Sequence, residues 1–168
     1  MNNKSVHQFD VQQMNGELMS LNKFHNKVLL IVNTASDCGF TPQLKDLETL
    51  RRNFEGEDFE ILAFPSNDFG GQEPRDGIEI LKFCQSGYDT HFQIFEKTRV
   101  RGEHAHPLFK FLSDKKLNGH VGAQPRWNFH KYLINRHGEV VDFFYPFTKP
   151  NSSKLKRRIL YQLKQEII

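Results

Sequence analysis

Two stretches of the chain carry apolar residues at both odd and even positions, so both faces of an extended backbone would be apolar. The first begins at Val28 and reads VLLIVNTAS, and the second is FEILAF at Phe59 to Phe64, which Pro65 closes. A strand that is covered on both faces of a sheet carries apolar residues in this way. The pattern therefore predicts two buried strands in the interior of one sheet.

A helical pattern lies between these two predicted strands. Thr41 is expected to cap the helix, Pro42 to take its first position and Gly56 to end it. One face of the helix carries apolar residues at a spacing of three or four, namely Leu44, Leu47, Leu50 and Phe54. A strand, a helix and a strand within this length form a βαβ unit, so the two strands should be parallel with a right-handed crossover.

The second half of the chain predicts an antiparallel pair of strands and a final helix. The strands are expected at Phe129 to Ile134 and Glu139 to Tyr145, joined by the turn NRHG with Gly138 at the position that needs a positive φ. The helix follows from about Ser152, and Asn15-Gly16 marks a small N-terminal hairpin. The order βαβ then ββα around one mixed sheet predicts a thioredoxin-like α/β fold.

Shorter elements are expected between the two halves. One brief helix is predicted at about Gly77 to Gln85, where it holds Cys84, and another at about His106 to Lys115. The segment from Leu117 to Trp127 is expected to be a loop, because it is rich in glycine and polar residues.

The length and composition suit one domain over residues 1–168. With 38% apolar residues, the chain can bury a core but is too short for two ordinary domains. A net charge of +3 with both signs mixed gives no reason to expect nucleic acid or an anionic membrane as a partner. No run approaches the ~20 apolar residues that cross a bilayer, and the N-terminus lacks a leader pattern, so a cytoplasmic protein is expected.

The sequence contains two cysteines, Cys38 and Cys84. In a cytosolic chain they are expected to stay reduced or to pair only transiently. There is no CxxC motif, and His104 and His106 form a lone HxH beside Pro107 that is more typical of a surface loop or helix start than of metal ligands. Neither a metal nor a cofactor is expected.

Cys38 follows the first predicted strand and precedes the helix. Backbone N–H groups and the helix dipole favour an anion there, so the thiolate should be more populated than for a free thiol. The second parallel strand ends at the same edge and runs into a loop bearing Gln72. The strand at Phe129 begins at that edge, directly after Trp127 and Asn128. These side chains, far apart in sequence, are expected to converge on one site.

A thiolate beside an indole N–H and two carboxamides is suited to peroxide reduction. The thiolate attacks one oxygen of the O–O bond, and negative charge develops on the departing oxygen. Neutral N–H donors can stabilise both charges without titrating near neutral pH.

Three separated segments resemble those of glutathione peroxidases: NTASDCGFTPQ, FPSNDFGGQEP and WNFHKYLINRHGEVV. The resemblance runs from about Phe9 to the C-terminal helix. It implies a thioredoxin-like peroxidase in which Cys38 is the peroxidatic cysteine, and in which Gln72, Trp127 and Asn128 complete a catalytic tetrad.

Cys84 matches the resolving cysteine of the family's non-selenium members, which use thioredoxin as their reductant. The resemblance implies that Cys84 captures the Cys38 sulfenic acid as an internal disulfide after its helix partly unwinds, since cysteines with Cα atoms more than ~7 Å apart cannot bond without backbone movement. Taken alone, Cys84 is more typical of a buried core thiol. Glutathione is an alternative reductant, and a redox relay that passes its disulfide to a partner protein is an alternative function.

The sequence departs from the common family pattern at several positions. Asp37 stands where relatives frequently carry lysine, and its side chain is expected to point away from the sulfur. Ser66 stands where many non-selenium relatives carry a third cysteine, and Gln93 replaces a usual proline. The short Leu117 to Trp127 connection lacks the insertion that tetrameric relatives use in subunit contacts, so the resemblance favours a monomer.

Overall fold

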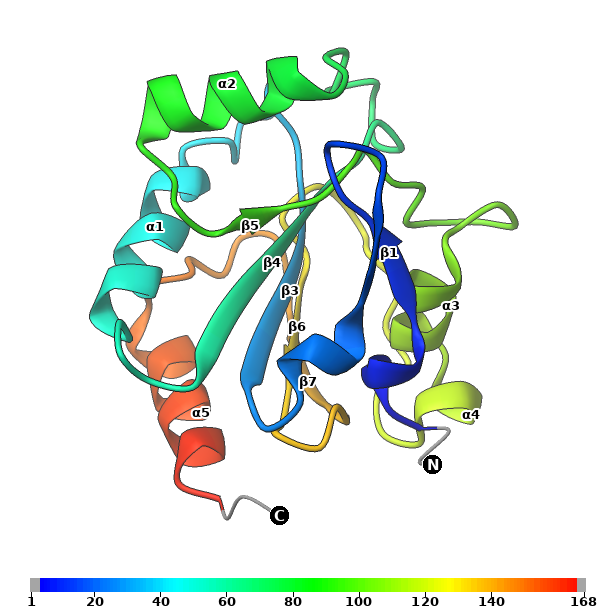
Figure 1. Ribbon diagram of the computed structural model, residues 1–168, viewed down its shortest axis with the longest axis vertical. Coiled ribbons are helices and arrows are strands. Elements are labelled where there is room, and N and C mark those ends of the chain that lie inside the picture. The colour runs from blue at the N-terminus through cyan, green and yellow to red at the C-terminus, as the bar shows by residue number, and fades with distance from the viewer. Residues whose placement is uncertain (1–3, 166–168) are drawn as a thin grey trace.

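The computed structural model of the protein describes residues 4–165, which form a five-stranded sheet with helices on both faces and a small N-terminal hairpin (Figure 1). The strands of the large sheet, in chain order, are β3 (Val28–Thr34), β4 (Phe59–Pro65), β5 (Gln93–Ile94), β6 (Lys131–Ile134) and β7 (Val140–Phe144). The hairpin consists of β1 (Asp10–Gln12) and β2 (Leu18–Ser20). Two short 3₁₀ turns flank it, η1 (Val6–Gln8) and η2 (Leu21–Phe24).

The helices are α1 (Gln43–Asn53), α2 (Ile78–Tyr88), α3 (Pro107–Ser113), α4 (Lys115–Asn118) and α5 (Ser153–Leu163). In Figure 1, α1 and α5 lie on one side of the sheet, α3 and α4 lie on the other, and α2 crosses above the end at which β3 and β4 finish. This end of the sheet is the one at which the sequence places its candidate chemistry.

The strand order β5-β4-β3-β6-β7 confirms the predicted topology. β3 and β4 are parallel and are joined through α1, whereas β6 is antiparallel to both β3 and β7. The turn between β6 and β7 contains Gly138 with φ of +84°, as predicted. The βαβ and ββα halves together form the thioredoxin-like fold.

Two apolar clusters cover the two faces of the sheet. Leu30 and Val32 of β3 pack in one cluster with residues of α1, α2 and α5. Leu29 and Ile31 pack in the other with residues of α3 and the N-terminal hairpin. Every residue of β3 is buried, which explains why its sequence is apolar on both alternations.

The start of α1 differs from the prediction at Thr41. The helix begins at Gln43, and Pro42 occupies the cap position without a side-chain hydrogen bond. The predicted cap at Thr41 is wrong because its hydroxyl is used elsewhere, in a bond to the backbone of Cys38. The helix α2 also runs further than predicted, through Gly87, and ends at Asp89 in the left-handed conformation.

The strand predicted from Phe129 begins two residues later. Phe129 has φ of +68°, so it cannot continue an extended strand, and its N–H donates to the carbonyl of Asn33 at 2.6 Å. The strand β5 was not predicted, because only two residues of it pair with β4. The predicted helix to Lys115 is divided at Asp114, whose extended backbone ends α3 and whose carboxylate caps α4.

Candidate active site

The loop that carries Cys38 is fixed by a buried hydroxyl. The Cys38 N–H donates to Thr41 Oγ1 at 2.9 Å, and the same hydroxyl donates to the carbonyl of Ala35 at 2.8 Å. Both Thr41 and Cys38 are buried, and Cys38 has 8% of its surface exposed. The loop therefore presents the thiol in a single defined place rather than on a free surface turn.

The sulfur of Cys38 accepts a hydrogen bond within this loop. The N–H of Phe40 lies 3.3 Å from Sγ and points to it. The backbone of the loop thus places one hydrogen-bond donor against the sulfur.

Gln72 is connected both to the Cys38 loop and to Asn128. The N–H of Asp37, which precedes Cys38, donates to the backbone carbonyl of Gln72 at 3.0 Å. The side-chain Oε1 of Gln72 accepts from Asn128 Nδ2 at 2.9 Å. Asn128 is fully buried, and its Oδ1 has no hydrogen-bond partner within residues 4–165. The amide of Asn128 is thus oriented by its bond to Gln72.

Trp127 is held against the glycine-containing loop that carries Gln72. Its backbone carbonyl accepts from Asn33 Nδ2 at 3.0 Å, and its ring lies 5.6 Å from that of Phe69. A Cβ placed on Gly70 would lie 3.2 Å from the indole, and Gly70 has φ of +66°. The close approach of the indole and the left-handed backbone both require glycine at this position.

The second cysteine, Cys84, lies in α2 with only 3% of its surface exposed. Cys84 and Cys38 belong to the same apolar cluster, and both are free thiols in this structure. Burial raises the pKa of Cys84 to about 12, with a further contribution from Glu73. Cys84 is therefore a neutral thiol while α2 is folded, which is the core-thiol arrangement that the sequence left open.

Asp37 points away from the sulfur, as predicted. Its side chain is about half exposed, and its carboxylate pairs with Arg75 at 2.9 Å. The same guanidinium lies 4.6 Å from the ring centre of Phe83, the residue before Cys84. Arg75 thus contacts the neighbours of both cysteines and neutralises the negative charge that Asp37 brings to the site.

Sequence reasoning did not identify Glu73, which is a buried acid at the site. It is 1% exposed, and its Oε2 accepts from Ser36 Oγ at 2.8 Å. Burial raises the pKa of this carboxyl. The signal was present as an acidic residue directly after Gln72, but an acid in a polar loop is usually exposed and so was not singled out.

Two further buried titratable residues lie where the chain enters β6. His130 is fully buried, and burial lowers its pKa to about 4. Lys131 is also fully buried, and burial lowers its pKa to about 7. The sequence signal was the pair HK inside FHKYLI, a segment otherwise typical of a buried strand.

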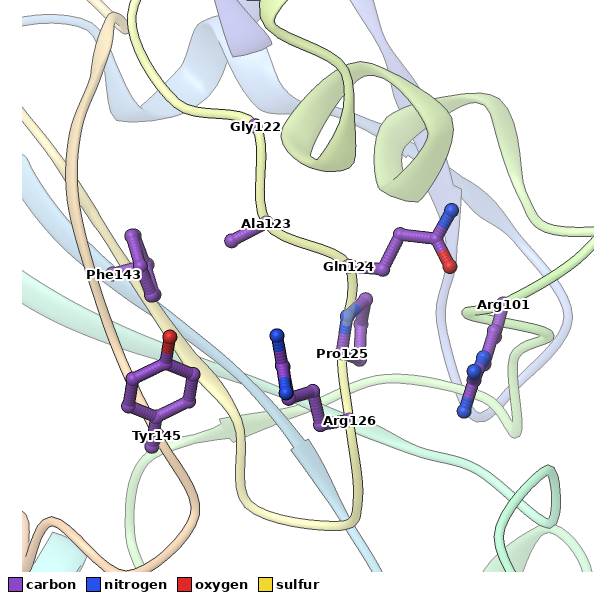
Figure 2. A pocket seen from close by; sticks show the side chains of 8 residues that line it. All are labelled: Arg101, Gly122, Ala123, Gln124, Pro125, Arg126, Phe143 and Tyr145. Atoms are coloured by element: carbon purple, nitrogen blue, oxygen red, sulfur yellow. The ribbon is translucent and has the colours of Figure 1, made fainter.

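A cavity of about 560 Å³ lies beside the segment that leads to Trp127. Figure 2 shows the guanidinium of Arg126 on the side of Phe143 and Tyr145, with Arg101 on the opposite side of the segment. The guanidinium of Arg126 lies 5.6 Å from the ring centre of Tyr145. The lining of the cavity combines two cationic side chains with aromatic rings and includes no acidic residue.

Two further findings concern residues 4–165 as a set. No three histidine, cysteine, aspartate or glutamate side chains in this range are grouped so that they could hold a metal ion. Over the same range, none of the helices has the length and apolar character that a membrane crossing needs.

A cysteine in the loop that follows the central strand β3, bonded through Asp37 to the segment of Gln72, defines this protein as a thiol enzyme with a thioredoxin-like fold. The family description "Glutathione peroxidase" matches residues 6–113. The chain is 45% identical over 146 residues to the glutathione peroxidase homolog BsaA of Halalkalibacterium halodurans, covering 87% of this chain and 92% of the relative. The chain therefore belongs to the glutathione peroxidase family and is a peroxidase.

Two other comparisons agree with this assignment. The hydroperoxy fatty acid reductase gpx1 of a Synechocystis species is 43% identical over 154 residues, which cover 89% of this chain and 91% of the relative. The crystal structure of T. cruzi GPX1 superposes with a TM-score of 0.74 at 31% identity, covering 95% of this chain and 96% of that one. The similarity thus extends over nearly the whole fold.

Proposed function

We propose that the protein reduces hydrogen peroxide and organic or lipid hydroperoxides through Cys38, and that thioredoxin then regenerates it. The single observation that best supports this function is the contact of Gln72 with both the Cys38 loop and Asn128. It joins the segments that carry three of the four predicted catalytic residues. The name of the Synechocystis relative favours fatty acid hydroperoxides among the substrates.

In the first step, the Cys38 thiolate attacks the terminal oxygen of the hydroperoxide. A sulfur–oxygen bond forms as the O–O bond breaks, and the departing alkoxide takes up a proton to leave as an alcohol, or as water when the substrate is hydrogen peroxide. Cys38 is oxidised to the sulfenic acid. Gln72, Trp127 and Asn128 act in this step as neutral donors and acceptors that orient the peroxide and stabilise the developing charge.

In the second step, Cys84 attacks the sulfur of the sulfenic acid. A disulfide forms between the two cysteines, and hydroxide leaves as water when it takes the proton of the Cys84 thiol. Because Cys84 is buried in α2, part of that helix must unwind first. A dithiol of thioredoxin then reduces the disulfide, which restores both thiols and oxidises thioredoxin. We further propose that the enzyme acts as a cytoplasmic monomer.

Mass spectrometry of the intact protein tests both steps. After one equivalent of peroxide, the wild-type protein should lose two hydrogens as the internal disulfide forms. Cys38→Ser should not react and should have no turnover, whereas Cys84→Ser should gain one oxygen and then stall with thioredoxin. Full thioredoxin-dependent turnover of Cys84→Ser would refute the resolving role of Cys84.

Glutathione would act differently, because it reduces the sulfenic acid through a mixed disulfide with Cys38. Under that mechanism, Cys84→Ser should turn over with glutathione as fast as the wild-type protein. A redox relay would instead give slow turnover with either reductant, while a Cys84→Ser variant would trap a partner protein on Cys38. The rates with each reductant at its cellular concentration distinguish these three cases.

A further inference from the structure

The segment that presents Trp127 and Asn128 ends in an unusual backbone conformation. Phe129 has φ of +68°, a region that bulky residues rarely adopt because it strains the backbone. Its N–H is bonded to the carbonyl of Asn33, and the Asn33 side chain is bonded to the carbonyl of Trp127. The end of β3 therefore fixes this segment from one side.

A buried lysine holds the other side of the same segment. Lys131 is fully buried, and its Nζ donates to the carbonyl of Phe129 at 2.7 Å and to that of Pro146 at 3.2 Å. Because Phe129 is left-handed, its carbonyl has left the ladder of the sheet and needs a partner of its own. The Lys131 amine supplies that partner within the protein interior.

An apolar residue would be the expected choice at position 131. Its cross-strand partners, Val32 and Phe144, are both buried apolar residues on the same face of the sheet. Burying an amine among them is costly, and its hydrogen-bond partners are two carbonyls, with the carboxylate of Asp46 acting on it only through its charge. This cost indicates that the two carbonyls need the donor.

The same bonds connect this segment with the helix that follows Cys38. The carbonyl of Pro146 also accepts from Gln43 Nε2 at 2.7 Å, and Gln43 is the first residue of α1. Lys131 and Gln43 thus share one acceptor. The entry to β6, the end of β7 and the start of α1 are joined at a single buried point.

We propose that Lys131 is a positioning residue for peroxide reduction, which fixes the left-handed turn at Phe129 and so presents Trp127 and Asn128 to Cys38. The proposal rests on the proposed function, because it assumes that Trp127 and Asn128 act on the peroxide. Lys131 itself touches neither the sulfur loop nor the substrate in this scheme.

The test replaces Lys131 by methionine, which has a similar length and no donor. Trp127 is the only tryptophan of the chain, so intrinsic fluorescence reports on this residue alone. We expect Lys131→Met to shift the Trp127 emission and to slow the peroxide step about tenfold or more, as for other small misplacements of catalytic groups. The rate at which thioredoxin reduces the oxidised enzyme should stay within twofold of wild type.

The matched control is Leu133→Ala, the next residue of β6 on the same face. Leu133 is fully buried, so its truncation should destabilise the fold and lower the urea midpoint without removing a bond to Phe129. We expect it to keep the wild-type peroxide rate at temperatures where it is folded. An equal loss of rate in Leu133→Ala, or a wild-type rate in folded Lys131→Met, would overturn the proposal.

A second variant covers the case in which Lys131→Met does not fold. Lys131→Gln retains a shorter N–H donor, and we expect its peroxide rate to fall below that of Leu133→Ala even if it is the more stable of the two. The opposite order would overturn the proposal. Trp127→Phe separates the assumptions: if it lowers the peroxide rate while Lys131→Met and Lys131→Gln do not, the proposed function stands and only the role of Lys131 fails.

Discussion

The hydroxyl of Thr41 is the point at which the Cys38 loop can be loosened with the smallest change of shape. Thr41→Val replaces the hydroxyl by a methyl group of similar size. In the native loop the hydroxyl accepts from the Cys38 N–H and donates to the Ala35 carbonyl, and Thr41 is 4% exposed. The substitution therefore leaves two backbone groups without their partner in a site that water does not reach.

The cost follows from those two groups. Leaving a buried donor or acceptor unpaired costs ~1–3 kcal/mol, so the loss of both partners in Thr41→Val should lower the free energy of unfolding by roughly 2–6 kcal/mol. Thr41→Ser is the matched control, because it keeps the hydroxyl and removes only a methyl group, at about 1 kcal/mol. Urea unfolding of the reduced protein measures both variants.

The same pair of variants tests whether this bond orients the sulfur. We expect Thr41→Val to slow the reaction of Cys38 with peroxide, because the Phe40 N–H that points to Sγ lies in the loosened loop. Thr41→Ser should react at nearly the wild-type rate. If the two variants unfold at the same urea concentration and react equally fast, the hydroxyl has no part in holding the loop and the reasoning is wrong.

Two further predictions concern charge. Because burial lowers the pKa of His130 from 6.5 to about 4, His130 should by itself reduce the free energy of unfolding by ~1.4 kcal/mol per pH unit as the pH drops from 6.5 to 4. Urea unfolding across this range should show a fall that is smaller by this amount in His130→Phe, and an unchanged slope would contradict the prediction. Arg75→Met removes the contacts to Asp37 and Phe83, which together are worth ~1 kcal/mol. Local opening of α2 should become easier by this amount, so an alkylating reagent should modify Cys84 about fivefold faster. Lys27→Met, which removes an exposed ion pair elsewhere, should leave that rate unchanged.

The sequence was sufficient for the elements whose pattern depends only on burial. β3 and β4 are apolar on both alternations because helices cover both faces, and α1 shows its buried face at helical spacing. The edge at which Gln72 and Asn128 meet followed from strand direction alone. These features are set by periodicity and topology, which a single sequence carries.

Two features that escaped prediction depend on a few specific hydrogen bonds. Thr41 has the residue type of a helix cap, and only the path of the loop directs its hydroxyl to Cys38 instead. Phe129 has the residue type of a strand, yet it is held in a left-handed conformation by its N–H, which donates to Asn33, and by its carbonyl, which accepts from Lys131. Such bonds join residues distant in sequence or fix one unusual torsion, and neither leaves a periodic signal.

The two helices beside the cysteines are equally long but packed to different depths. α1 and α2 have eleven residues each, and α1 buries five of them, whereas α2 fully buries only Ile80 and Cys84. α2 also contains Gly87, which weakens a helix interior by ~1 kcal/mol relative to alanine. Few buried contacts mean a small free energy of local opening, so α2 can release Cys84 while α1 keeps the Cys38 loop in place. Under the proposed mechanism, this difference in burial would let the neutral, buried thiol of Cys84 become exposed and react while the Cys38 loop stays folded.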